Sequence, residues 1–525
     1  MRHPGRAPTI QAMQYDVIII GGALSGGSAA MLLLRKNPGL RILIVEKSSR
    51  FTRKVGEATV EVSGYFLTRV LGLTQFLNET QITKQGLRFW FANDNVNTLP
   101  EASEIGPLYQ VRLPSFQVDR SVLDEEVLRR AAAAGATVLR PANVSDVTLN
   151  AGKMQAVTVQ HDDTTEIFEA RWVIDASGLA CLLARQEGWW RTNAEHPTAA
   201  AWGRWKGVKD WDGLELAEKY PEWASATYGI RNTATNHVVG DGWWSWWIPL
   251  KGGDVSVGVV FDQRLVIWPQ GEGTLAGRLK GFLLQHPVAR EMLADAELIE
   301  GDVHWRKNLA YHSETFVGDG FVLVGDAAAF LDPLYSPGMD WIAFTSASAA
   351  DLIEAQMRGE AMEPRLQQYN RDFSVSYRRW FVALYKDKYE YIGEFDLLRL
   401  AFLLDLGLYY LGVVAKPFQQ GLAALNHPPF SIFTSHTPFH VMRAYNRRFA
   451  AIARSRRERG RLGRMNCGQR DLISGYTLDG GDIRLLVRPL LAWVRIEIAE
   501  GWRSWWRGPR AGAVEPLPTP VKLAA

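Results

Sequence analysis

Cysteine, net charge and long apolar runs are all scarce in this chain of 525 residues. The two cysteines, Cys181 and Cys467, stand far apart and form no metal-ligand spacing, so neither a metal site nor a disulfide framework is expected. The formal net charge of +3 gives no indication of a nucleic-acid partner. The longest apolar run, 398–414, contains two charged residues and falls short of the roughly 20 apolar residues that span a membrane. These absences predict a cytoplasmic globular protein.

Strands of one kind return three times along the chain. The apolar, β-branched run 15–20 (YDVIII) is typical of a strand buried on both faces of a parallel sheet. An expected helix at 26–36 and a second expected strand at 41–46 follow it, and similar strand and turn patterns occur at 171–178 and 320–344. We therefore expect an α/β fold in which a doubly wound, Rossmann-like domain is assembled from separate segments.

The turn after the first strand carries a dinucleotide-binding pattern. Gly21 and Gly26 take the first and third positions of G-x-G-x-x-G, and Glu46 lies where a carboxylate accepts hydrogen bonds from a ribose. Ala23 replaces the second glycine, and its methyl group would hold a pyrophosphate slightly further from the backbone. The alternative is a plain packing turn between strand and helix.

Three further motifs resemble those of the flavoprotein monooxygenase superfamily: 117–128 (QVDRSVLDEEVL), 175–178 (DASG) and 325–333 (GDAAAFLDP). In that superfamily the carboxylate of the Gly-Asp pair binds the ribityl hydroxyls of FAD, a role that the resemblance assigns to Asp326. The resemblance implies bound FAD, although Arg120, at the start of a helix, would also suit a surface position. The cofactor-binding residues implied in this way are Gly21, Gly26, Glu46, Gly56, Glu57, Ala58, Thr59, Arg120, Asp175, Gly178, Asp326, Pro333 and Gly338.

With this resemblance the chain divides into four expected segments. Residues 14–190 form the first part of an FAD-binding domain, and 301–360 form the part that returns to it. Residues 191–300, rich in tryptophan and strand-like, form a substrate layer, and 361–525 form a helical C-terminal region with a basic-aromatic tail.

Within this superfamily the chain is similar to the flavin-dependent halogenases. The segment 244–249 (WSWWIP) fits their W-x-W-x-I-P motif, 330–338 (FLDPLYSPG) fits F-x-x-P-x-x-S-x-G, and 55–59 (VGEAT) fits the segment after the nucleotide-binding turn. The catalytic residues that the resemblance implies are Lys84, Trp244, Trp246 and Ser336.

The tryptophans suit a wall between flavin and substrate. Bulky indoles would keep the flavin from oxygenating an organic ring directly, so that halide is oxidised to hypohalous acid instead. Alternation along a strand places Trp244, Trp246 and Ile248 on one face, with Trp243 and Trp247 on the other. The alternative is that these residues only form a buried core.

Lys84 suits the capture of that small oxidant. Its ammonium would donate a hydrogen bond to the oxidant, or, with its pKa lowered by desolvation, form a haloamine. We expect Lys84 in a strand that shares one face with Gly86, Arg88 and Trp90, and a solvated strand lysine is the alternative.

Two residues depart from the halogenase motifs. Tyr335 stands where tryptophan-acting members carry a glutamate, which favours a phenol- or pyrrole-acting enzyme over one that acts on free tryptophan. Pro337, between Ser336 and Gly338, has no N–H, so at least one backbone donor for a halide is lost. Pro337 favours the first alternative function, a flavin monooxygenase or an isoprenoid-type reductase on the same fold.

The predicted function is halogenation of an electron-rich aromatic compound, phenol- or pyrrole-like and either lipid-like or bound to a carrier protein, with reduced FAD, O₂ and halide. Because the sequence has no second dinucleotide motif, we expect a separate flavin reductase to supply the reduced FAD. A non-enzymatic, membrane-associated flavin-binding protein is the second alternative.

The C-terminal region combines arginine with tryptophan. Residues 441–464 hold nine arginines against one glutamate, and 485–510 interleaves tryptophan with arginine. We expect 441–510 to contact either an anionic membrane surface or an acidic carrier protein, and a solvated helix face is the alternative.

Overall fold

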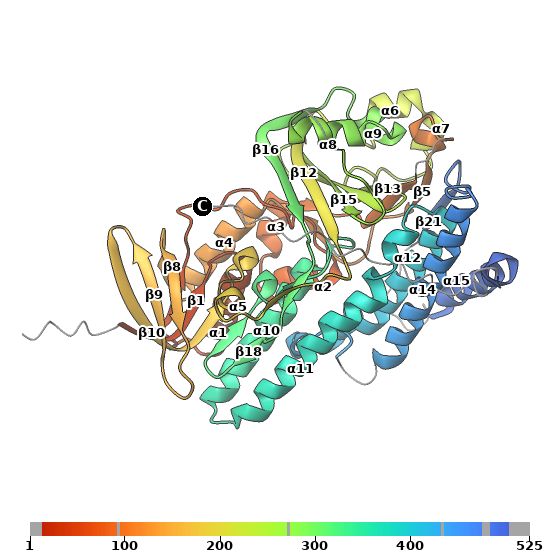
Figure 1. The fold of residues 1–525 in the computed structure, drawn as a ribbon. Coiled ribbons are helices and arrows are strands. Elements are labelled where there is room, and N and C mark those ends of the chain that lie inside the picture. The colour runs from red at the N-terminus through yellow and green to blue at the C-terminus, as the bar shows by residue number, and fades with distance from the viewer. Residues whose placement is uncertain (1–12, 92–94, 270–272, 432–434, 475–482, 503–525) are drawn as a thin grey trace, which may run out of the picture.

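The computed structural model describes residues 13–91, 95–269, 273–431, 435–474 and 483–502. Figure 1 shows a parallel sheet flanked by helices at the lower left, a second strand-rich region at the top, and long helices that run from the bottom to the right.

The first sheet is doubly wound, as predicted. Its strand order is β18-β19-β10-β1-β2-β7; β19, β10, β1, β2 and β7 run parallel, and an antiparallel β8–β9 hairpin is attached to β10. The strands are β1 (Met13–Ile20), β2 (Ile42–Val45), β7 (Thr137–Leu139), β8 (Asn143–Thr148), β9 (Gln155–His161), β10 (Thr164–Asp175), β18 (Val317–Gly318) and β19 (Phe321–Leu323). The helices that pack with it include α1 (Leu24–Lys36), α4 (Arg120–Ala133) and α10 (Gly338–Met357). Because helices cover the sheet, its central strands are apolar on both faces.

The second sheet has eight strands in the order β16-β12-β15-β14-β13-β4-β5-β21. Most neighbours are antiparallel, but β13 pairs with β4, and β21 with β5, in parallel. The strands are β4 (Leu87–Phe91), β5 (Ser103–Pro107), β12 (Thr198–Lys206), β13 (Thr235–Gly240), β14 (Trp243–Pro249), β15 (Val255–Asp262), β16 (Glu297–Lys307) and β21 (Arg470–Ile473). Helices α6 (Leu214–Lys219), α7 (Pro221–Ala224), α8 (Leu275–Leu283) and α9 (Pro287–Met292) lie at its outer end (Figure 1).

This sheet draws on more of the chain than the predicted substrate layer at 191–300. Strands β4 and β5 come from the segment before it, and β21 comes from the C-terminal region. Each of these strands joins residues far apart in sequence, and such a pairing leaves no local signal.

The C-terminal region is mainly helical, as predicted. Its elements are α11 (Met362–Trp380), η5 (Phe381–Tyr385), η6 (Lys388–Glu390), α12 (Phe395–Tyr409), η7 (Tyr410–Val414), α13 (Ala415–Gln420), η8 (Leu422–Asn426), α14 (His436–Glu458), α15 (Ile483–Ile496) and η11 (Glu497–Gly501). The helix Phe395–Gln420 is long and apolar enough to cross a membrane, as many buried core helices also are, and 56% of its most apolar stretch is buried inside the protein. The apolar run expected to be too short is therefore part of a longer, largely packed helix.

Short elements complete the fold and connect its regions. They are α2 (Glu61–Tyr65), η1 (Phe66–Val70), α3 (Thr74–Thr80), β3 (Ile82–Thr83), η2 (Leu99–Glu101), β6 (Phe116–Gln117), η3 (Gly178–Ala180), α5 (Leu182–Gln186), β11 (Trp190–Thr192), β17 (Tyr311–Ser313), η4 (Gly325–Ala327) and β20 (Ala329–Phe330).

The tryptophans of β14 divide between two cores. Trp244 and Trp246 belong to the large core that includes the parallel sheet, whereas Trp243 and Trp247 belong to the separate core under α8 and α9. This is the alternation expected of a strand. A Cβ at Gly258 of the neighbouring β15 would lie 2.2 Å from the Trp246 ring, so the indole fits only because that position is glycine.

Candidate functional site

The turn after β1 holds three backbone segments in close contact. A Cβ at Gly21 would lie 2.6 Å from the Ala176 carbonyl oxygen, and one at Gly26 would lie 1.9 Å from the Gly21 carbonyl oxygen. The Glu46 carboxylate accepts a hydrogen bond of 2.8 Å from the Gly22 N–H. These glycines let the backbone segments approach one another closely at the carboxyl end of the parallel sheet, where dinucleotides bind in doubly wound folds.

A polar cluster lies beside the N-terminus of α1. Asp124, which the sequence did not single out, accepts from the Leu24 N–H at 3.2 Å, from the Arg120 guanidinium at 3.1 Å and from Lys54 at 2.6 Å. Arg120 also donates to the Gly56 carbonyl oxygen at 3.4 Å. Burial lowers the pKa of Lys54, and the nearby Arg120 charge adds to this. The cluster carries a net positive charge, which suits the phosphates of a dinucleotide, but the phosphate contact of Arg120 stays a prediction.

The two predicted aspartates of the cofactor site differ in their partners. Asp175 accepts hydrogen bonds from the N–H groups of Ser177 (2.9 Å) and Leu183 (2.8 Å), and so shapes the turn that contains Gly178. No hydrogen bond reaches the Asp326 carboxylate from the described residues, and burial raises its pKa. The carboxylate is half-buried on the wall of a small cavity and keeps its acceptor positions free of described donors, and the ribityl hydroxyls of FAD would occupy them. The residues present therefore fit the cofactor.

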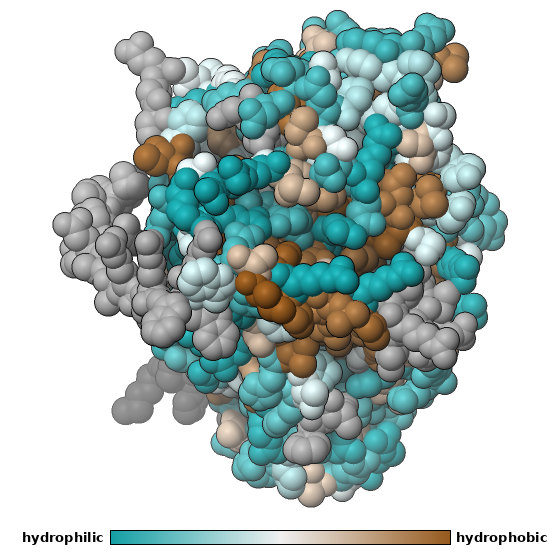
Figure 2. All heavy atoms as spheres, turned by 90° about the vertical axis from the view of Figure 1, so that its right-hand side faces the viewer, coloured by the Kyte–Doolittle hydropathy of each residue, from teal (hydrophilic) through white to brown (hydrophobic). Residues whose placement is uncertain are grey.

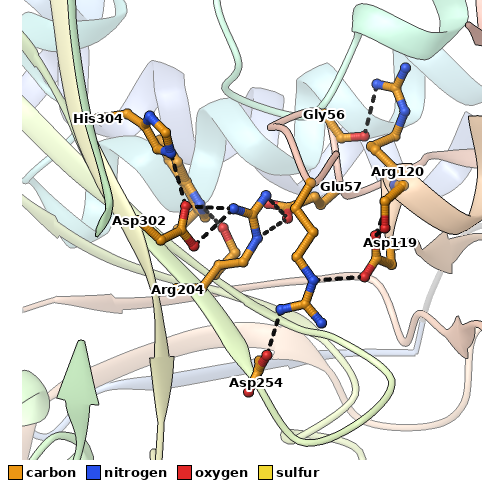
Figure 3. A network of polar contacts seen from close by, with 12 residues as sticks. Gly56, Glu57, Asp119, Arg120, Arg204, Asp254, Asp302 and His304 are labelled. Atoms are coloured by element: carbon orange, nitrogen blue, oxygen red, sulfur yellow. Dashed lines mark hydrogen bonds and ion pairs between the residues drawn. The ribbon is translucent and has the colours of Figure 1, made fainter. Parts of the chain in front are cut away.

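The segment 55–59 ties the two sheets together (Figure 3). The buried Glu57 carboxylate accepts from Arg204 of β12 at 2.9 Å, and Arg204 donates to Asp302 of β16 at 2.9 Å. Asp302 in turn lies 2.9 Å from His304. Burial raises the pKa of Glu57 against the effect of Arg204. Contact between this segment and the cofactor stays a prediction, whereas its anchoring by Glu57 is a feature of the structure.

Lys84 is deeply buried, with 1% of its side chain exposed, and its Nζ donates to the Thr59 carbonyl oxygen at 2.7 Å. The sequence predicted Lys84 inside a strand, but the residue lies between β3 and β4. The reason is Gly86, whose φ of 74° turns the chain there. Burial lowers the pKa of Lys84 to about 8, although the charges of Glu61 and Asp340 oppose this. Lys84 is thus a desolvated amine, and its catalytic role stays a prediction.

Lys84 lines a cavity of about 450 Å³ between the second sheet and the C-terminal helices. Most of the wall is apolar, and large parts of it come from α12, η7 and the loop at 107–115, with further residues from η5 and α14. The polar and aromatic groups on the wall include Glu61, Tyr335, Asp340, Asp405 and Tyr409. A largely apolar cavity with a few converging polar groups is the usual form of a small-molecule site.

Two carboxylates on this wall were missed from the sequence. Asp340, in the first turn of α10, accepts from the Ser63 N–H at 2.8 Å and from the Tyr409 hydroxyl at 2.7 Å. Burial raises its pKa to about 7. Glu61 accepts from the Tyr410 hydroxyl at 2.6 Å. The one signal in the sequence that could have identified Asp340 was its place at the start of an otherwise apolar helix. An aspartate in that place also fits an ordinary helix terminus.

The turn into α10 has an unusual backbone. Tyr335 (φ 68°) and Ser336 (φ 56°) are consecutive non-glycine residues in the left-handed region, and the Ser336 N–H donates to the Pro333 carbonyl oxygen at 2.9 Å. Pro337 and Trp380 line both the large cavity and a small one of about 20 Å³. Other residues of the small cavity are Asp326, Phe330, Asp332, Gly338, Trp341 and Tyr377. The turn therefore separates the predicted cofactor side from the large cavity.

Trp244 and Trp246 line neither cavity. The Trp244 N–H donates to the Tyr389 hydroxyl at 2.8 Å, and the Trp246 N–H donates to the Ser256 hydroxyl at 3.1 Å. Both indoles are buried. Their role as a screen between flavin and substrate stays a prediction, as does a direct role for Ser336.

Known proteins are similar to this chain over most of its described length. The family model "Tryptophan halogenase" matches residues 16–100 and 92–389. The flavin-dependent halogenase chlA of Dictyostelium discoideum is 28% identical over 384 residues, which are 66% of this chain and 61% of the relative. The sulochrin halogenase gedL of Aspergillus terreus is 28% identical over 375 residues, 66% of this chain and 64% of the relative. The chain thus spans less than two thirds of the length of these two relatives.

A third relative and two solved structures extend the comparison. A 1H-pyrrole-2-carbonyl-[peptidyl-carrier protein] brominase of Pseudoalteromonas luteoviolacea is 26% identical over 362 residues, 69% of this chain and 82% of the relative. The halogenase PltM, solved with phloroglucinol and FAD, has a TM-score of 0.69 at 19% identity and covers 92% of this chain and 98% of its own. The halogenase CmlS has a TM-score of 0.61 at 21% identity, with coverages of 93% and 78%. These structures share the fold, and because the family model matches well over half of the sequence, the chain belongs to the tryptophan halogenase family of FAD-dependent proteins.

Proposed function

We propose that this protein halogenates an electron-rich aromatic ring of the phenol or pyrrole class, with reduced FAD, O₂ and halide as co-reactants. The observation that carries the proposal is the setting of Lys84. Its amine is buried on the wall of a largely apolar cavity, is held by the Thr59 carbonyl oxygen, and forms no ion pair with any described residue. An amine with these surroundings can hold a small oxidised halogen and present it to a ring in the cavity.

Bound reduced FAD, with O₂ and halide, supplies the oxidised halogen. Lys84 acts on it in one of two protonation states, since its pKa of about 8 leaves both populated near neutral pH. The ammonium donates a hydrogen bond, and the neutral amine can bond to the halogen. The apolar wall excludes water, which would otherwise carry the oxidant away.

Asp340 and Glu61 supply acceptors for a phenol O–H or a pyrrole N–H in the same cavity. A hydrogen bond from the substrate to a carboxylate raises the electron density of the ring, which electrophilic halogenation requires. The names of two relatives, a sulochrin halogenase and a halogenase solved with phloroglucinol, support a phenolic substrate. One relative is a brominase that acts on a pyrrole bound to a carrier protein, and its name supports a second form of this proposal, in which the substrate is bound to a carrier protein.

The proposed partners are a flavin reductase and the aromatic substrate, and the proposed location is the cytoplasm. The single dinucleotide motif of the sequence, which FAD would occupy, supports a separate reductase as the source of reduced FAD.

A flavin monooxygenase or reductase on the same fold is the second candidate. Two observations favour it: Pro337 offers no N–H beside the small cavity, and Trp244 and Trp246 do not line the large one. A monooxygenase would add one oxygen atom to the substrate instead of a halogen.

The test is mass spectrometry of phenols and pyrroles incubated with the protein, a flavin reductase, NADH, O₂ and bromide. We expect a brominated product from the wild type, and loss of that product in Lys84→Met with flavin oxidation retained. Lys251→Met is the matched control, since Lys251 also donates to a backbone carbonyl oxygen but is exposed. A hydroxylated product, unaffected by Lys84→Met, would contradict the proposal in favour of the monooxygenase, and no flavin oxidation at all would favour a non-enzymatic flavin-binding protein.

A further inference from the structure

Helix α15 and the turn η11 that continues it have two apolar faces. The inner face packs on the C-terminal helices, where the Trp493 ring lies 6.2 Å from Tyr445 and 6.1 Å from Phe449. The outer face leaves large apolar side chains between 48% and 73% exposed. These are Val487, Leu491, Val494, Ile498 and Trp502. They recur at steps of three and four residues and therefore form one continuous stripe along the helix.

The charges around this stripe have one sign. Arg488 and Arg495 are exposed next to it and form no ion pair with any described residue. The acids of the same segment are used elsewhere, because Glu497 pairs with Arg448 at 2.8 Å and Glu500 pairs with Arg456. Among the described residues, the stripe is thus flanked by positive charge that no acid compensates.

Several arginines of α14, unlike Arg488 and Arg495 of α15, form ion pairs within the protein. Arg456 pairs with Asp396 at 2.7 Å, and Arg457 pairs with Glu390 at 2.8 Å. Part of the basic stretch 441–464 is therefore neutralised within the protein, whereas Arg443 and Arg447 of α14 are exposed and form no ion pair with any described residue. Within the predicted contact region 441–510, the exposed basic-aromatic surface is α15 with η11, while 475–482 and 503–510 lie outside the described residues.

We propose that the outer face of α15 and η11 docks on the surface of an anionic lipid bilayer. Exposed valine, leucine and isoleucine would enter the boundary between headgroups and acyl chains, Trp502 suits the interface itself, and the two arginines would meet lipid phosphates. Figure 2, which views the side of the molecule on the right of Figure 1, shows apolar residues gathered there with hydrophilic side chains across and around them. This proposal does not depend on the halogenation chemistry.

A second copy of the chain fits this face less well. The nineteen residues of α15 and η11 make a helix about 30 Å long at 1.5 Å per residue. A stripe about 10 Å wide then covers roughly 300 Å², well below the ~800 Å² that each partner of a stable dimer buries. Pairing two such faces would also bring their arginines together without a counter-charge.

The test is co-sedimentation of the full chain with vesicles of phosphatidylcholine alone and of phosphatidylcholine mixed with phosphatidylglycerol. We expect binding to the mixed vesicles that weakens as salt is added. The double variant Leu491→Glu/Val494→Glu should lose this binding. Removing the two charges with Arg488→Gln/Arg495→Gln should weaken it by about tenfold or more.

Ile267→Glu is the matched control, because Ile267 is 91% exposed but lies outside this region. This variant should bind the vesicles as the wild type does. Circular dichroism and thermal unfolding of each variant should match the wild type, since only exposed side chains change. Absence of binding to the mixed vesicles would overturn the proposal. An equal loss of vesicle binding in Ile267→Glu would also overturn it. A third contrary outcome is a wild-type chain that binds no vesicles but forms a dimer in solution, which Leu491→Glu/Val494→Glu dissociates.

Discussion

Two lysines that are buried near the large cavity differ in the charge of their hydrogen-bond partners. Lys388 donates to the Asp405 carboxylate at 2.7 Å, and Asp405 also accepts from the hydroxyls of Tyr335 and Tyr445. Lys84 donates only to a neutral acceptor among the described residues, the Thr59 carbonyl oxygen. Burial lowers the pKa of both lysines, but only Lys388 has a carboxylate in contact that compensates its charge. The difference separates a structural ammonium from one whose charge is left for a ligand.

The largest expected effect is a loss of unfolding free energy when the Lys388–Asp405 pair is broken. Lys388→Met leaves a buried carboxylate with only hydroxyl donors, and removing one partner of a buried pair costs about 3–5 kcal/mol. Lys84→Met leaves no carboxylate without its partner and should not destabilise the fold. Urea unfolding of both variants checks this, and equal destabilisation of the two would remove the distinction between the lysines.

The second prediction concerns the pH dependence of stability. Lys84 has a folded pKa of about 8 and an ordinary unfolded value of 10.5, so between these values the unfolded state binds more protons and wild-type stability rises with pH. Below pH 8 the full penalty applies, roughly 3 kcal/mol for a shift of this size. Lys84→Met lacks this titration.

The measured quantity is the difference in unfolding free energy between Lys84→Met and the wild type. This difference should be largest in favour of the variant below pH 8 and should decrease as the pH rises toward 10.5. Lys251→Met should show no such trend because Lys251 is exposed. A flat difference would mean that the Lys84 amine is not desolvated.

The smallest expected effect is a change in the pH dependence of kcat/KM when Asp340 is replaced. Its pKa of about 7 predicts a rise of kcat/KM as Asp340 ionises; with the Lys84 ammonium as the acting form, the Lys84 pKa of about 8 adds a fall at higher pH and gives a bell-shaped profile, whereas a neutral acting amine gives no such fall. Asp340→Asn should remove the acid limb and lower kcat/KM by roughly tenfold, less than the 10²–10⁴ of a full general base. An acid limb that persists in Asp340→Asn would show that the ionisation belongs to another group.

The sequence predicted those parts of the fold whose signals are local. Gly21, Gly26 and Glu46 lie within one strand–helix–strand unit, and the α/β class that they indicate is confirmed. The alternation of Trp244 and Trp246 against Trp243 depends only on strand geometry, and the two cores follow it. Motif spacing likewise identified the family.

The remaining features depend on contacts between distant segments. Asp340 and Glu61 reach the Lys84 cavity from α10 and α2, and neither helix carries a pattern that marks its first acid as unusual. Lys84 was expected in a strand because the residues around it alternate, but the turn at Gly86 separates β3 from β4 at this point. The neutralisation of Arg456 by Asp396 could not be predicted either, since sixty residues separate the two side chains.

The parallel pairing of β21 with β5 has a consequence for the order in which the cavity is completed. Pro107 and Ile473, the last residues of these strands, face each other in register and both line the cavity. During synthesis from the N-terminus, the glycine turn and most of the second sheet emerge long before residue 470. The cavity therefore cannot be completed until residue 473 has left the ribosome, and a product truncated before β21 would leave one side of that cavity open.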